Sequence, residues 1–159
     1  MPEQSSAPGD SLVHLAAAGG GIRALAALTT QTVEEARRRH DLYPTAAAAL
    51  GRTLTGAALL GAALKGEERL MIEIVADGPL GKITAEANAC GHLRGYVHHP
   101  HVHLPPNAQG KLDVSGAVGK GHLYVIKDLG MREPYRGMVP LVSGEIAEDL
   151  AYYLKVSEQ

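Results

Sequence analysis

The sequence is poor in the residue types that build reactive or cross-linked proteins. It contains one cysteine, Cys90, and neither Phe nor Trp. A single thiol excludes an internal disulfide and a cysteine-rich zinc site. Because large aromatic side chains are limited to six tyrosines, we expect the tyrosines and many small aliphatic residues to fill the core through close packing of helices and sheets.

The sequence also lacks an excess of charge and a long apolar run. The net charge of −2 argues against nucleic acid or an anionic membrane as a partner. No stretch approaches the ~18 apolar residues of a membrane span. The N-terminus has no basic region before an apolar core, so it predicts a disordered tail (1–10) rather than a secretory signal. The expected compartment is the cytoplasm, and the remaining length fits one domain, 11–159.

Hydrophobic periodicity predicts an α+β fold, with one mostly buried helix, sheet strands on either side of it in sequence, and a helix at the end. A helix at about 44–65 begins with Pro44 and is rich in Ala, Leu and Gly, so it is apolar nearly all round and should be buried. The alternating segments that follow it are expected to form an antiparallel meander. Alternating patterns predict strands at 12–16, 22–29, 70–75, 82–89, 92–98, 114–118 and 122–127, with irregular connections at 100–110 and 130–136.

Two further helices are predicted from capping signals. Thr32 and Glu35 have the spacing of a capping box before a helix that ends in a basic run. Ser143 is the expected N-cap of the last helix, whose first turns carry a solvated acidic face (Glu145, Glu148 and Asp149) and whose buried face holds Ile146, Leu150, Tyr153 and Leu154.

The histidines of the segment HHPHVH are the first candidates for chemistry. If the segment is extended, His99, His101 and His103 share one face beside His98, and imidazoles in this arrangement can bind zinc, nickel or copper. However, the sequence offers neither an HExxH motif nor a second ligand cluster. Incidental metal affinity is the preferred interpretation, and a metal-binding function is kept as the alternative.

The other candidate groups have simpler structural explanations. Cys90 with His92 lacks a third group to orient the base, and Ser143 lacks the GxSxG context of a nucleophile. The three consecutive glycines 19–21 fit a hairpin turn better than a phosphate loop. The basic run 37–40 has no interleaved aromatic residues for stacking bases. The sequence therefore predicts no enzyme and no catalytic, cofactor-binding or metal-binding residue.

Several segments together resemble one known family. They are 41–65, 69–97 with the strings DGPLG and GHLRGY, 107–119 (NAQGKLDVSGAVG), 122–130 (HLYVIKDLG) and 137–159 (GMVPLVSGEIAEDLAYYLKVSEQ). They occur in the order found in the core domain of the 33-kDa heat-shock protein family, the redox-regulated holdase chaperones. The likeness extends over nearly everything after residue 40.

The resemblance implies an ATP-independent holdase that binds unfolding client proteins and forms a homodimer. It also implies a layered β/α/β core in which mostly antiparallel sheets enclose the buried helix at about 44–65. Family members also carry a C-terminal switch with CxC and CxxC motifs, which binds zinc when reduced and unfolds on oxidation. This sequence reaches Gln159 without those motifs, so we expect an incomplete core domain. Zinc is expected only in the switch, and Cys90 matches none of its ligands.

The sequence therefore leaves three classes of function open. A holdase chaperone core is favoured by the resemblance, and a metal-binding protein built on the histidines 98–103 is the alternative. A small hydrolase is third. The resemblance assigns no client-binding residue.

Overall fold

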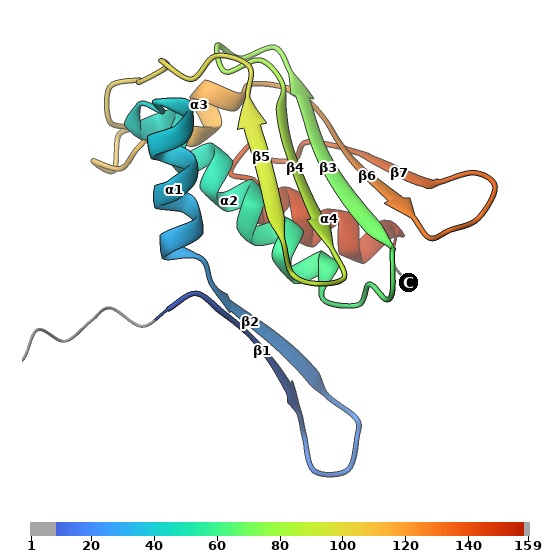
Figure 1. Ribbon diagram of the computed structural model, residues 1–159. Coiled ribbons are helices and arrows are strands. Elements are labelled where there is room, and N and C mark those ends of the chain that lie inside the picture. Colours follow the sequence, from blue (N-terminus) through green and yellow to red (C-terminus); the bar gives the residue numbers. More distant parts are fainter. Residues whose placement is uncertain (1–8, 158–159) are drawn as a thin grey trace, which may run out of the picture.

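The computed structural model describes residues 9–157 and shows an α+β chain with two antiparallel sheets (Figure 1). The predicted fold class is confirmed. In chain order the elements are β1 (Ser11–Ala16), β2 (Arg23–Leu28), α1 (Thr30–His40), α2 (Pro44–Gly61), β3 (Arg69–Ala76), β4 (Ile83–Asn88), β5 (Leu93–Val97), α3 (Val114–Val118), β6 (Gly121–Asp128), β7 (Tyr135–Pro140) and α4 (Ala147–Ser157). Strands β1 and β2 pair with each other, and the larger sheet has the order β5-β4-β3-β6-β7.

Helix α2 is the buried helix that the sequence predicts. Its side facing the larger sheet carries Leu50 and Leu54, which are almost completely buried there. The hydroxyl groups of Thr53 and Thr55 donate to the carbonyl oxygens of Ala49 and Gly51, so these polar side chains are satisfied within the helix. The helix ends at Gly61 rather than at residue 65, because the next amides bond three residues back in tighter turns.

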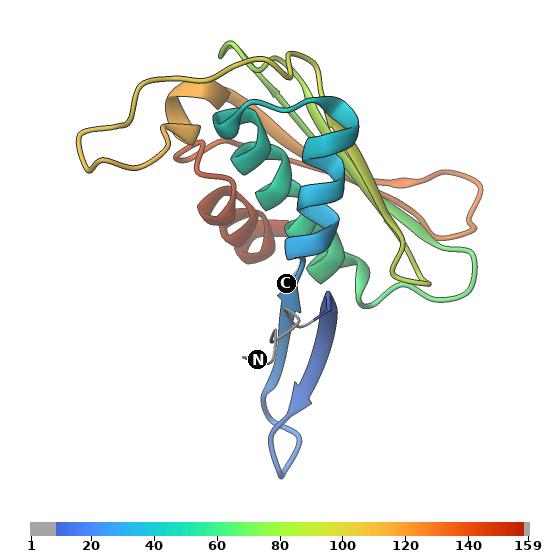
Figure 2. The same ribbon diagram turned by 60° about the vertical axis from the view of Figure 1, so that its left-hand side comes forward.

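The two sheets do not cover α2 to the same extent. Helices α1, α2 and α4 lie on one face of the five-stranded sheet (Figure 2). Thus α2 has the sheet on one side and parts of α1 and α4 on the other. The smaller sheet is a hairpin that projects away from the helices and contacts α2 through β2 (Figure 1). Its turn is formed by the predicted glycine segment, with Gly19 and Gly20 at positive φ and the Ala17 amide donating to the Ile22 carbonyl.

The meander of β3, β4 and β5 is confirmed, but the segment 114–118 is wrongly predicted as a strand. It forms the short helix α3, because the Asp113 side chain accepts a hydrogen bond from the Gly116 amide at 2.9 Å and caps the turn. Gly116 lies so close to this carboxyl group that a Cβ there would be 2.4 Å from it. The connection predicted at 130–136 also runs into a strand, since β7 begins at Tyr135.

Both predicted capping residues are wrong. Helix α1 begins before Thr32, and its first amides, of Gln31 and Thr32, donate to the side chain of Asp10 at 2.9 and 2.6 Å. Asp10 belongs to the segment predicted as a disordered tail, of which residues 1–8 lie outside the described residues. A carboxyl group far away in sequence thus replaces the local capping box, an arrangement that spacing rules do not detect.

Helix α4 begins at Ala147 instead of directly after Ser143. The expected cap is replaced by Asp149, which was assigned to the solvated face but is completely buried. Its Oδ1 accepts from the amides of Val142 and Ser143, and its Oδ2 accepts from the amide of Ile146. The carboxyl group reaches back from inside the helix and organises the chain that enters it.

The core is built from aliphatic residues, as expected, but the tyrosines do not fill it. Tyr153 is the one tyrosine of residues 9–157 with no exposed surface, whereas Tyr43 and Tyr96 are each 47% exposed. The remaining core side chains are supplied mainly by α2 and by one face of the larger sheet, including Leu70, Ile72, Ile74, Ile83, Leu123 and Val125. Close approach of small residues therefore replaces aromatic volume.

Candidate functional site

Large apolar side chains stay exposed in several parts of the chain, and three surfaces stand out. The first is the hairpin β1–β2. One of its faces presents Val13, Leu15 and Leu28, which are 44%, 56% and 38% exposed. The other face carries Leu12, His14 and Leu25, and Leu12 and His14 line a small cavity with Cys90 and the turn between β4 and β5. The Val13 face is apolar surface that soluble proteins usually cover.

The second surface is a groove of about 770 Å³ between α1, α2 and α4, which we name the helix groove. It begins where β2 ends, at Thr29. Its walls are Val33 of α1 and Leu150, Ala151 and Leu154 of α4, and its floor is made of small residues of α2 (Ala47, Ala48, Gly51, Thr55 and Gly56). Leu154 was predicted to be buried, but it is 45% exposed at the groove wall.

Two glycines give the helix groove its shape. A Cβ at Gly51 would lie 2.8 Å from Val33 Cγ1, and a Cβ at Gly56 would lie 2.4 Å from Leu150 Cδ1. These contacts show that α1 and α4 pack directly on the backbone of α2. The small residues between the two contacts leave an open apolar floor. In the sequence, this helix is apolar nearly all round. Such a helix needs other elements to cover each of its sides.

The third surface is the outer face of the larger sheet, opposite the helices. Val75, Tyr96 and Met138 on this face are 45%, 47% and 56% exposed. Ion pairs between strands interrupt it, including Lys82 with Glu73 and Arg94 with Glu86. It is a mixed surface, whereas the helix groove has a floor of mainly apolar residues, with Arg52 and Glu34 at its border paired to Glu145 and Arg37.

The structure separates the histidines of the segment 98–103. The rings of His98 and His99 stack on each other at 4.4 Å, His101 Nε2 lies 2.9 Å from Asp41 Oδ2, and His103 Nδ1 lies 2.9 Å from the hydroxyl of Thr45. Across residues 9–157, no group of three or more His, Cys, Asp or Glu side chains is arranged to hold a metal ion. The metal-binding alternative thus has no structural observation in its favour.

The backbone of this histidine segment has a structural task. The carbonyl oxygens of Pro100 and Val102 accept hydrogen bonds from the amides of Tyr43 and Ala46, at 2.9 and 3.3 Å. The first amides of a helix have no partner within the helix. The segment therefore satisfies the N-terminal end of α2, where Pro44 supplies no amide of its own.

The candidate nucleophiles are not assembled into catalytic groups. Cys90 is exposed in the turn after β4, where its amide and that of His92 both donate to Asn88 Oδ1. The Nδ1 atom of His92 lies 3.4 Å from Asn88 Nδ2. The Ser143 hydroxyl accepts from the amide of Glu145, within the entry to α4. Cys90, His92 and Ser143 thus take part in the hydrogen bonds of turns.

The basic run at the end of α1 is paired with acidic residues on the same helix. Arg37 bonds Glu34, while Arg38 and Arg39 both bond Glu35. The hydrogen bond from Arg37 lowers the pKa of Glu34, and those from Arg38 and Arg39 lower the pKa of Glu35. The run therefore presents little free positive charge. Among the described residues, no helix has the length and apolar character that crossing a bilayer requires.

Comparisons with known proteins agree with the resemblance seen in the sequence. The family model described as Hsp33 protein matches residues 10–159. The 33 kDa chaperonin of Desulforamulus reducens is 58% identical over 150 residues, and that of Geobacillus kaustophilus is 56% identical over 152 residues. These alignments cover 94% and 95% of this chain but 51% and 52% of the relatives, so the chain spans about half their length.

A solved structure extends the agreement to three dimensions. The 33 kDa chaperonin (heat shock protein 33 homolog) of Thermotoga maritima matches with a TM-score of 0.90 and 45% sequence identity, over 93% of this chain and 51% of that protein. The match of sequence and of fold over nearly the whole chain leads to one conclusion: the chain belongs to the Hsp33 family.

Proposed function

We propose that the chain is a holdase chaperone region that binds unfolding polypeptides without ATP and keeps them from aggregating. The observation that carries this proposal is the helix groove, an apolar surface left open on a fold shared with proteins named 33 kDa chaperonin. Unfolding proteins expose apolar side chains, and such side chains gain free energy when another apolar surface removes them from water. The glycines 19–21 form a hairpin turn, so they do not argue for a nucleotide.

The helix groove offers client side chains several weak contacts that add up, and it does not form one pocket specific for a single side chain. Burying one client Leu or Phe side chain contributes about 1.5–3 kcal/mol. Micromolar binding requires about 8 kcal/mol after the cost of ordering both partners. Several client side chains must therefore be bound together, which suits long unfolded segments better than short peptides. Such contacts depend little on client sequence, as a general holdase requires.

Two substitutions on α4 test the role of the helix groove. Leu154 lines the groove and is 45% exposed, whereas Val156 is 50% exposed on the same helix but does not line it. We expect Leu154→Asp to weaken protection of a heat-denatured client, measured by light scattering without ATP. Val156→Asp is the matched control. Equal protection by both variants would show that clients do not use the groove, and no protection by the unmodified chain would refute the holdase function.

We also propose that this chain responds little to oxidation. Its one thiol, Cys90, is exposed in a turn and has no second cysteine to pair with inside the chain. The zinc switch that the resemblance implies therefore has no ligands at these positions. Light scattering in reductant and in peroxide tests this proposal, and a large gain in protection after oxidation would contradict it.

The remaining proposals concern assembly, compartment and chemistry. The uncovered Val13 face and the free edges of the hairpin favour pairing between two copies, so we propose a homodimer. We place the protein in the cytoplasm and assign it binding rather than catalysis, with no cofactor held by these residues. A strict monomer in sedimentation at high concentration would contradict the dimer.

A further inference from the structure

The two edges of the larger sheet are not equivalent. At the β7 edge, the Leu141 amide donates inward to Gly121, so Pro140 is one of the residues whose backbone faces outward, and proline has no amide to donate. Proline on an edge strand discourages pairing with another strand. The opposite edge strand, β5, has the sequence LRGYV and no proline. It therefore has no such protection.

The hydrogen bonds at both ends of β5 show which of its backbone groups are free. The His98 amide donates to Lys82 at 2.8 Å, and the Asn88 amide donates to His92 at 3.2 Å. Bonding alternates along an antiparallel pair, so Arg94 and Tyr96 bond inward to β4. The other three residues, Leu93, Gly95 and Val97, direct three amides and three carbonyls outward, and no group within residues 9–157 bonds to them.

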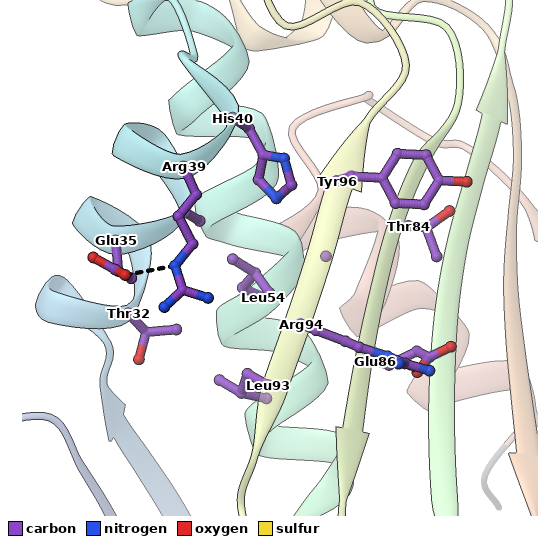
Figure 3. Close-up of a pocket in the computed structure, with 12 residues that line it drawn as sticks. Thr32, Glu35, Arg39, His40, Leu54, Thr84, Glu86, Leu93, Arg94 and Tyr96 are labelled. Atoms are coloured by element: carbon purple, nitrogen blue, oxygen red, sulfur yellow. Dashed lines mark hydrogen bonds and ion pairs between the residues drawn. The ribbon is translucent and has the colours of Figure 1, made fainter.

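This free edge borders a second groove, of about 690 Å³, between β5 and α1, which we name the edge groove. Figure 3 shows that Arg94 and Tyr96 point away from α1, across β4 towards Glu86 and Thr84, so they leave the edge uncovered. The apolar side chains of Leu54 and Leu93 line the groove, and Thr32, Glu35, Ala36, Arg39 and His40 of α1 form its far wall.

Gly95 allows the middle of β5 to pack closely against α2 and β4. A Cβ at Gly95 would lie 2.6 Å from the Thr84 carbonyl and 3.1 Å from Leu54 Cδ2, so a larger residue has no room there. The charged side chains around the groove are already paired, Arg39 with Glu35 and Arg94 with Glu86 at 2.5 Å each. The groove therefore offers backbone hydrogen bonds and apolar contact, with little net charge to select a sequence.

We propose that the edge groove binds an extended segment of an unfolding client, which adds to the larger sheet as a strand next to β5. The inference rests on the proposed holdase function and names a second, main-chain mode of capture. Every unfolded polypeptide carries free amides and carbonyls whatever its sequence, and a strand edge binds those groups. The strand β5 covers about 17 Å at ~3.4 Å per residue, which limits the added segment to about five residues.

Hydrogen exchange measured by NMR tests the proposal directly. The probe is reduced, carboxymethylated α-lactalbumin, which stays unfolded, added to the isotope-labelled chain. We expect exchange at the amides of Leu93, Gly95 and Val97 to slow by about tenfold or more when client binds. The amides of Arg94 and Tyr96, already bonded to β4, change little. This alternation separates strand addition from general burial of β5.

Two arginine variants provide the matched perturbation. Arg39 lines the edge groove and Arg38 does not, yet both are about equally exposed and both pair with Glu35. We expect Arg39→Trp to fill the groove, abolish the alternating protection and weaken client binding by about tenfold, the loss of roughly one or two hydrogen bonds. Arg38→Trp should behave like the unmodified chain, and circular dichroism verifies that both variants are folded.

The outcomes distinguish this inference from the function on which it rests. Client held in solution with unchanged exchange at these amides would overturn strand addition and leave the holdase function intact. A chain that neither binds client nor prevents its aggregation would overturn both. Protection of the same amides that grows with protein concentration, without client, would assign this edge to a second copy and also overturn the inference.

Discussion

Asp149 offers the sharpest test of how the C-terminal part of the fold is held. It is completely buried, and its two carboxyl oxygens accept three backbone amides, those of Val142 at 2.7 Å, Ser143 at 3.0 Å and Ile146 at 2.9 Å. These bonds fix the turn between β7 and α4, in which Ile146 has an unfavourable positive φ of 70°. Removing the carboxyl group should release the whole turn.

The expected magnitude follows from the surroundings of each amide. A buried donor without a partner costs about 1–3 kcal/mol. The Ile146 amide lies in the buried interior and the other two are partly buried, so Asp149→Ala should lower the free energy of unfolding by about 4 kcal/mol. Asp149→Asn keeps one acceptor oxygen but places the side-chain NH2 group opposite the backbone amide of Ile146. Because two donors then face each other, this variant should lower the free energy of unfolding by about 2 kcal/mol.

Urea unfolding followed by circular dichroism measures both variants. The control is Glu148→Gln, the neighbouring acidic residue in the first turn of α4, which is exposed. Loss of its charge near the helix N-terminus should cost at most about 0.5 kcal/mol. If Asp149→Asn is no more destabilising than this control, the three hydrogen bonds do not hold the turn and the reasoning fails.

Three further predictions concern other parts of the chain. Asp10→Ala should fray the start of α1 and cost about 1 kcal/mol, seen as faster exchange of the Gln31 and Thr32 amides. Desolvation raises the pKa of Asp10, but the Thr32 hydroxyl and the two amides outweigh it and lower the pKa below 3.8. This stabilisation should therefore be complete above pH ~4 and be lost as the pH falls through the lowered pKa; if Asp10→Ala destabilised the chain more as the pH fell below ~4, this would be contradicted. Leu15→Lys should weaken self-association in sedimentation, whereas His14→Lys on the opposite hairpin face should not; equal effects would exclude the Val13 face as the interface. Gly78→Ala should destabilise by about 2 kcal/mol or more, because its Cβ would meet the Ala117 and Val118 backbone at 2.4 Å; urea unfolding with an unchanged midpoint would refute this.

The fold could be predicted where local pattern decides the structure. The strands of the meander, the hairpin turn and the buried helix all follow from alternation, glycine spacing and apolar content. The predictions of helix starts are wrong where a group from elsewhere in the chain determines the structure. Asp10 caps α1 from the segment before β1, and Asp149 caps the turn before its own helix. Such contacts depend on the tertiary arrangement, so spacing rules assigned the caps to Thr32 and Ser143 instead.

The candidate surfaces could be predicted in kind but not in position. Composition and resemblance indicated apolar binding surface rather than reactive groups. The helix groove depends on where α1 and α4 meet α2, and the edge groove depends on which strand ends the sheet. Neither groove can be read from the sequence of a single segment. The many small residues of α2 were visible in the sequence, but the packing of Val33 and Leu150 determines which of them remain uncovered.

Helix α2 also explains how the chain can expose apolar surface and remain folded. Leu50 and Leu54 on one side are buried against the sheet, and a Leu→Ala change there would cost about 2–5 kcal/mol. The other side carries alanines and glycines, which contribute little to stability when they are left partly exposed. Among the larger side chains that line the groove, Leu154 belongs to α4 and is already 45% exposed. Changes at Leu154 should therefore alter client binding far more than stability, whereas changes at Leu54 should do the reverse.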